Sequence, residues 1–83
     1  MDTQNTYKTD DLLFAAFLLT NNIKLVNVVE DFPRHFSFVL SDSKKCQELK
    51  ISFLNNAPAP ARQLFSQREM LLSEIKMKNQ YGK

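Results

Sequence analysis

Residues 12–19 read LLFAAFLL, a run of eight apolar side chains that decides how the rest of the chain must be arranged. Eight helical residues make about 12 Å, against about 30 Å for the hydrocarbon core of a bilayer, so the run is too short to span a membrane. A signal peptide carries positive charge before its apolar run, whereas Asp10 and Asp11 precede this one. The run therefore predicts neither a membrane anchor nor a secretion signal.

The same run is predicted to be a buried helix. It contains only Leu, Phe and Ala and no β-branched residue, which favours helix over strand. Thr9 or Asp10 can cap its first turn, where acidic side chains also suit the helix dipole. Because a helix that is apolar on every side must be covered on nearly every side, residues 12–19 are the expected central core helix of a small domain.

Two strands are predicted after this helix. Residues 23–31 (IKLVNVVED) are rich in β-branched side chains, and residues 34–41 (RHFSFVLS) alternate, with Phe36 and Phe38 on one side and His35 on the other. The connection between them is short enough for an antiparallel hairpin. We expect the phenylalanine side of this hairpin to be buried against the helices.

A second and a third helix are predicted downstream. Residues 41–54 begin with Ser and Asp caps and continue at helical spacing, and although 49–54 also alternate as a strand would, the length of the unit favours helix. Prolines and asparagines then form a linker at 55–60. The apolar stripe expected to bury the third helix consists of Ala61, Leu64, Phe65, Leu71, Leu72 and Ile75.

The predicted fold class is therefore α+β, in a single domain over residues 1–83 with the order helix, β-hairpin, helix, helix. Residues 1–8 and 79–83 are expected to be flexible. A core of this size only just stabilises a fold without metals or disulfides, so self-association would help it. The lone Cys46 cannot form an internal disulfide and is expected to be a small core residue, which indicates a cytoplasmic protein.

Catalytic chemistry has little basis in the sequence. Acid–base or nucleophilic catalysis needs several groups held together, and the chain has one His and one Cys, which are also too few for a zinc site. Its only glycine is Gly82, which excludes the glycine-rich loops that hold nucleotide phosphates. We expect a small non-catalytic binding or adaptor protein with no metal and no cofactor.

The third helix carries a second group of residues roughly opposite its apolar stripe. Met70 and Met77 are seven residues apart, with Gln63 and Glu74 around them. Isolated exposed methionines are common, so incidental surface positions are one interpretation. The other is an interface for a partner protein or for self-association, since Met adapts to varied partners. A structural homodimer joined by this helix is one form of the second interpretation.

Residues 34–41 resemble the third strand of RNA-recognition-motif domains, in which a basic residue is followed by two aromatics two positions apart and a valine. The resemblance covers about residues 34–56 and departs from the family at His35 and Ser37 and in lacking a first strand with the other stacking aromatic. It implies an alternative function, the binding of single-stranded nucleic acid, in which Phe36 and Phe38 would stack on bases. The competing interpretation is that these phenylalanines are buried in the core. The residues offered for that function are Arg34, Phe36, Phe38, Lys44, Lys45 and Arg62.

A second resemblance lies in three stretches: YKTDDLLFAAFLL at 7–19, IKLV at 23–26 and FSFVLSD at 36–42. Together they resemble a small uncharacterised domain family of bacteria and their phages. The resemblance implies the same order of elements and an accessory or regulatory protein of a bacterium or phage. It implies no activity.

Overall fold

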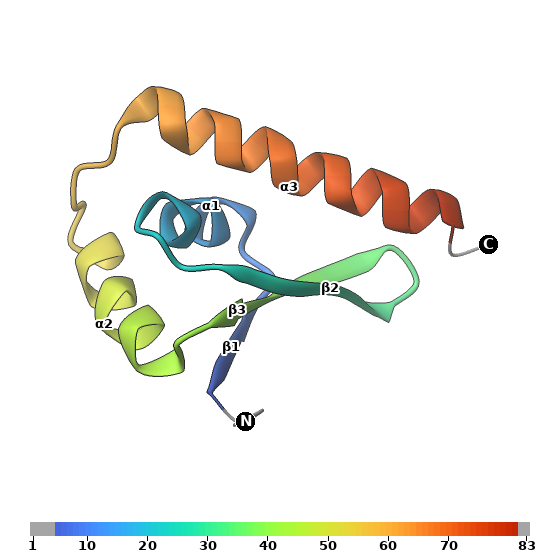
Figure 1. Cartoon of the computed structure of the whole chain (residues 1–83), viewed down its shortest axis with the longest axis horizontal. Helices are drawn as coiled ribbons and strands as arrows, with labels where there is room; N and C mark the ends of the chain where they lie inside the picture. The colour runs from blue at the N-terminus through green and yellow to red at the C-terminus, as the bar shows by residue number, and fades with distance from the viewer. Residues whose placement is uncertain (1–4, 82–83) are drawn as a thin grey trace.

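Three helices and three strands make up the fold in a computed structural model, which describes the backbone of residues 5–81 and the side chains of residues 5–77 (Figure 1). The α+β class is confirmed, as are the predicted helix, hairpin, helix and helix. The elements in chain order are β1 (Thr6–Thr9), α1 (Leu12–Thr20), β2 (Leu25–Phe32), β3 (His35–Ser41), α2 (Ser43–Leu54) and α3 (Ala61–Tyr81).

The strand β1 was not predicted. The expectation that residues 1–8 are flexible is wrong from Thr6 onward, because Thr6–Thr9 pair antiparallel with β3. The carbonyl of Asn5 extends this pairing by accepting a hydrogen bond from the Asp42 N–H at 3.1 Å. Residues 1–4 lie outside the described residues.

The sheet of the described residues has the order β1-β3-β2, with both neighbouring pairs antiparallel. The strands β1 and β2 therefore run parallel with β3 between them, and α1 connects them. This is the split β-α-β arrangement of ferredoxin-like folds, in which the helix of the connection packs on one face of the sheet. After α2 the chain enters α3, and no fourth strand follows within the described residues.

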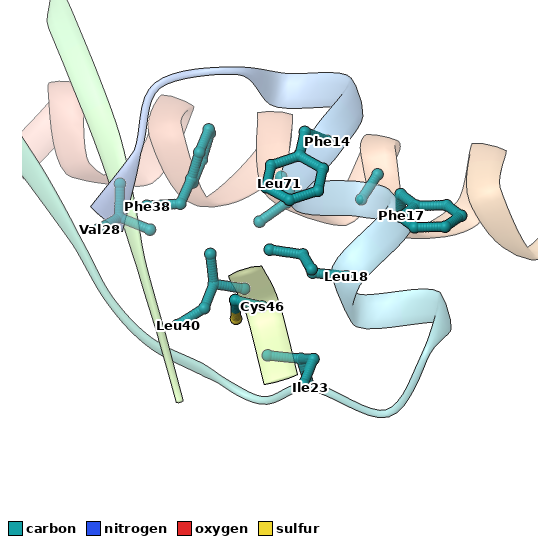
Figure 2. Packing of buried hydrophobic residues seen from close by; sticks show 11 residues of the cluster. Phe14, Phe17, Leu18, Ile23, Val28, Phe38, Leu40, Cys46 and Leu71 are labelled. Carbon is teal, nitrogen blue, oxygen red and sulfur yellow. The ribbon is translucent and has the colours of Figure 1, made fainter. Parts of the chain in front are cut away.

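The apolar run forms α1 and is buried, as predicted. Its residues Phe14 to Leu18 are all at most 4% exposed, because α1 lies between the sheet and α3 (Figures 1 and 2). The helix is capped by Asp11, whose side chain accepts a hydrogen bond from the Phe14 N–H at 3.1 Å. The predicted caps were wrong by one or two positions, since Thr9 accepts from the Asp11 N–H instead.

One face of the sheet carries the core and the other faces solvent. Val28, Phe38 and Leu40 point from the sheet toward the helices, where Phe14 and Leu71 meet them (Figure 2). The predicted burial of the phenylalanine side of the hairpin is thus confirmed for Phe38. No helix of the described residues covers the opposite face (Figure 1), as antiparallel sheets allow.

Asparagines end the first two helices. Asn22 and Asn56 adopt left-handed backbone conformations, with φ of 69° and 61°, just after α1 and α2. The alternative strand at 49–54 is excluded, because α2 continues to Leu54. The last helix begins at Ala61, as predicted, and reaches Tyr81, so the expected flexible segment 79–83 is helical over its first three residues; residues 82–83 lie outside the described residues.

Candidate functional site

The predicted partner-binding residues lie together on an exposed side of α3. Leu71 is fully buried, whereas Met70 is 36% and Met77 is 48% exposed. Gln63 and Glu74 are exposed as well. Projected at about 100° per residue, these four side chains fall within about 60° of one another around the helix. The structure therefore brings all four together on one accessible surface.

Two small residues extend this surface. Ser66 and Ser73 are exposed and lie beside Met70 and Met77 in the same projection. Arg62, Glu69 and Lys76 gather on the adjoining flank of the helix, which begins about 20° beyond Ser73. We call the resulting surface the methionine face, in which Glu74 is the single charged member. Its residues are Gln63, Ser66, Met70, Ser73, Glu74 and Met77.

The last helix is less deeply buried than its sequence predicts. Leu64 and Ile75 are partly buried beside Leu71, but Phe65 is 61% and Leu72 is 36% exposed. The reason is geometric, because α3 rests on the narrow ridge of α1 and covers only the side that holds Leu64, Leu71 and Ile75. The expectation that Ala61, Phe65 and Leu72 belong to the buried stripe is wrong.

The aromatic residues offered for nucleic-acid binding are in the core. Phe38 is 1% exposed and Phe36 is partly buried against the core, so Phe38 has no free ring face for a base. The first strand that the RNA-recognition-motif resemblance lacked is present as β1, which corrects that part of the prediction. Its aromatic residue Tyr7 packs edge-on against Phe14, with ring centroids 6.0 Å apart. The competing interpretation, a buried aromatic face, fits this arrangement.

The basic residues offered for the same function lie far apart. Arg34 is in the turn between β2 and β3, at one end of the molecule, while Lys44 and Lys45 are in the first turn of α2 and Arg62 is in the first turn of α3 (Figure 1). Phosphate binding along a strand requires positive charges that follow a common groove. These four side chains do not form one basic patch.

The turn that holds Arg34 has an unusual backbone. Arg34 has φ of 68°, and its N–H donates to Glu30 Oε2 at 2.9 Å. Pro33 precedes it, which makes this a type II turn, where the left-handed position favours glycine. Phe32 beside the turn is 65% exposed, with its ring 5.3 Å from that of His35. The turn thus presents one aromatic and one basic side chain to solvent.

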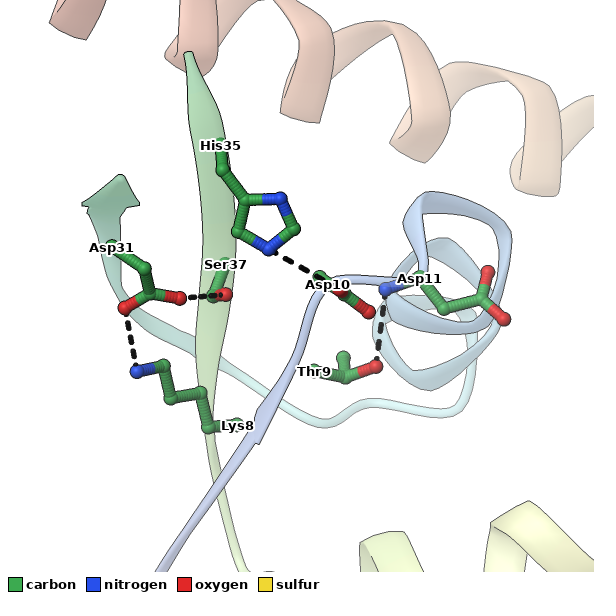
Figure 3. Close-up of polar contacts among 7 residues, drawn as sticks. All are labelled: Lys8, Thr9, Asp10, Asp11, Asp31, His35 and Ser37. Carbon is green, nitrogen blue, oxygen red and sulfur yellow. Dashed lines mark hydrogen bonds and ion pairs between the residues drawn. The ribbon is translucent and has the colours of Figure 1, made fainter. Parts of the chain in front are cut away.

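A group of polar side chains ties the three strands together on the open face of the sheet (Figure 3). Lys8 Nζ lies 2.7 Å from Asp31 Oδ1, and the Ser37 hydroxyl donates to Asp31 Oδ2 at 2.5 Å. The hydrogen bonds from Lys8 and Ser37 lower the pKa of Asp31 below its usual value of 3.8. His35 Nε2 lies 3.3 Å from Asp10 Oδ2.

These polar contacts connect neighbouring strands of the sheet. The Ser37 hydroxyl donates to the Asp31 carboxylate, which also accepts a hydrogen bond from Lys8 and whose lowered pKa makes it a weak base for removing that proton. Among residues 5–81, no group of three or more His, Cys, Asp or Glu side chains is arranged to hold a metal ion. The Asp31 carboxylate of β2 thus links Lys8 of β1 and Ser37 of β3.

Cys46 is a core residue, as predicted. It is 0% exposed, and its thiol donates to the Ser41 carbonyl at 3.3 Å. Burial raises the pKa of the Cys46 thiol, and the nearby Asp42 carboxylate raises it further. The side chain therefore remains a neutral thiol rather than a reactive thiolate.

One exposed apolar surface was missed by the sequence reasoning. Ile51 and Leu54, on the outer side of α2, are 65% and 68% exposed. In the sequence, the exposed Lys50 directly precedes Ile51, and the exposed Arg62 lies three residues before Phe65. Ile51 and Leu54 share one side only if this segment is helical, and the competing strand pattern at 49–54 hid that relation.

The fold defines a small α+β domain built on a split β-α-β sheet. Residues 4–67 match the family described as a domain of unknown function (DUF5659), and the chain belongs to that family. This confirms the resemblance to a small uncharacterised domain family. No curated protein and no solved structure matches the chain.

The family match has a boundary inside α3. It includes Gln63 and Ser66, whereas Met70 and Met77 lie beyond its last matched residue. The two methionines thus belong to a part of the helix that the family description does not reach. None of the helices traced over residues 5–81 has the length and apolar character needed to cross a bilayer.

Proposed function

We propose that this chain is a small binding protein that acts without catalysis and binds another protein through the methionine face of α3. The observation that supports this most directly is the exposure of Met70 and Met77, at 36% and 48%, on a helix side where Glu74 is the one charged residue. Depletion of charge with enrichment of Met is typical of the centre of protein interfaces. Unbranched thioether side chains also adapt to the shape of a partner.

The location of the reactive side chains supports the non-catalytic part of the proposal. His35 lies on the open face of the sheet and pairs with Asp10, while Cys46 is buried on the helix side. The chain's one imidazole and one thiol are therefore separated by the sheet. Ser37, the hydroxyl nearest to His35 along β3, is engaged by Asp31.

The biological setting is part of the same proposal. The resemblance of residues 7–42 to a domain family of bacteria and phages supports an accessory or regulatory role in such a system. The buried, unpaired thiol of Cys46 supports a reducing compartment, the cytoplasm.

The test is affinity purification from the native cell, followed by mass spectrometry with and without nuclease. The double variant M70E/M77E should lose the partner, because two carboxylates then face an apolar surface without compensating charge. The matched control is I51E/L54E, which changes two residues that are even more exposed but lie on α2. Circular dichroism melting checks that both variants are folded.

Comparison of the two double variants shows whether the partner binds to α3 or to α2. Loss of the partner in I51E/L54E with retention in M70E/M77E would place the binding site on α2 and contradict the proposal. A partner that disappears after nuclease treatment would contradict it as well, because the bridge would then be nucleic acid.

A further inference from the structure

The geometry of the methionine face points to one occupant, a second copy of this chain. We infer that two copies pair through their α3 helices, antiparallel, with a two-fold axis passing beside Met70. The inference rests on the proposed function, which it narrows from a protein partner to this protein itself.

The charge of the surface is the first argument. A symmetric pair brings the same patch of two copies together, so every charge in the patch meets an environment made of the same residues. In the methionine face Glu74 alone is charged, and the other members are Gln, Ser and Met. The exposed apolar residues of α2, Ile51 and Leu54, adjoin Lys50 in the sequence, so a symmetric pair through them would bring like charges near one another.

The spacing along α3 is the second argument. Gln63 and Met77 each lie seven residues from Met70, and Ser66 and Glu74 each lie four residues from it. An antiparallel pair centred on Met70 therefore sets Gln63 against Met77 of the second copy and Ser66 against its Glu74. Each carboxylate then meets a hydroxyl that can donate to it. A parallel pair would instead place Glu74 beside Glu74.

The size of the surface predicts a weak dimer. The face extends from residue 63 to residue 77, about 21 Å of helix at 1.5 Å per residue. One helix side from each copy is smaller than the roughly 800 Å² that each partner buries in a standard interface. We therefore expect dissociation constants on the order of micromolar, as in transient complexes, and an average mass that rises with concentration.

Disulfide cross-linking reads the arrangement directly. With helix axes about 10 Å apart and Cα atoms about 2.3 Å from each axis, facing Cα atoms are about 5 Å apart, within the span of a disulfide. The variant M70C places its thiol on the axis, so it should form covalent dimers under mild oxidation. In Q63C the two thiols are about 21 Å apart, which a disulfide cannot bridge.

The controls use the same helix. The double variant Q63C/M77C should cross-link again, because position 63 faces position 77 of the other copy, while M77C alone should not. The wild-type chain controls for its own thiol, since Cys46 is 0% exposed. We expect M70C and Q63C/M77C to form dimers at least about 10-fold faster than Q63C, M77C or the wild-type chain.

Three results would overturn the inference. One is M70C dimerising no faster than Q63C, and another is all single variants cross-linking equally, as in a parallel pair. The third is a wild-type mass that stays monomeric at every concentration in sedimentation velocity. If the chain is monomeric but M70E/M77E still abolishes capture of a different protein, the inference fails and the proposed function stands. If M70E/M77E changes neither, both fail.

Discussion

Replacement of Leu71 by alanine tests how α3 is attached to the rest of the fold. Leu71 is 0% exposed and is the one fully buried residue among the described side chains of α3, where it meets the core around Phe14 (Figure 2). Loss of a buried leucine side chain costs about 2–5 kcal/mol, from lost transfer free energy and the cavity that remains. A chain of this length has a total stability of about 4–12 kcal/mol, so L71A should remain folded only marginally.

The neighbouring residue supplies the matched control. Leu72 is 36% exposed, so L72A removes the same atoms from a position that is already open to solvent and leaves no closed cavity. Urea unfolding followed by circular dichroism should show a loss of about 3 kcal/mol for L71A and about 1–1.5 kcal/mol for L72A. A loss of about 3 kcal/mol corresponds to about 12–24 °C in Tm for a domain of this size. Equal effects in the two variants would refute the packing of α3 on α1.

Three further predictions follow from other parts of the structure. R34G should raise the free energy of unfolding by about 0.5–1 kcal/mol in urea titrations. Glycine removes the backbone strain of an arginine with positive φ, and this gain exceeds the cost of the added entropy in the unfolded chain. A destabilised R34G would contradict the type II turn. The lowered pKa of Asp31 contributes stability that is present above pH 3.8, its usual pKa, and is lost as the pH falls through the pKa of the folded state. The wild-type chain should therefore have a higher urea midpoint than D31N at pH 7, and the difference should shrink by pH 3. A difference that widens in acid would be inconsistent with this. Single-stranded RNA or DNA should not be retained in filter binding even at low salt, and steeply salt-dependent retention that K44A/K45A/R62A abolishes would count against this arrangement of the basic residues.

The core could be predicted from the sequence because its signal is local. The run 12–19 has a composition that favours a helix and a length too short to span a bilayer, and both follow from neighbouring residues. The alternation around Phe38 likewise fixed which side of the hairpin is buried. The heptad spacing of Met70 and Met77 was enough to place them on one exposed side of α3.

The features that were missed depend on contacts between distant residues. The strand Thr6–Thr9 is too short to show a period of its own, and it forms because β3 offers it an edge. Phe65 fits the helical stripe by spacing, yet it is exposed because α1 is too narrow to reach it. The left-handed φ of Arg34 arises from the closure of the hairpin, which no propensity of arginine indicates.

We expect the methionine face to be the contact surface of this protein. NMR of methyl-labelled methionine observes that contact directly. The chain has three methionines, so M70L and M77L variants assign the signals. The Met70 and Met77 methyl signals should shift together as the protein concentration rises from micromolar to millimolar, with little change at Ile51 and Leu54 in a parallel isoleucine- and leucine-labelled sample. Constant signals for Met70 and Met77 over that range, with shifts at Ile51 and Leu54 instead, would contradict the account.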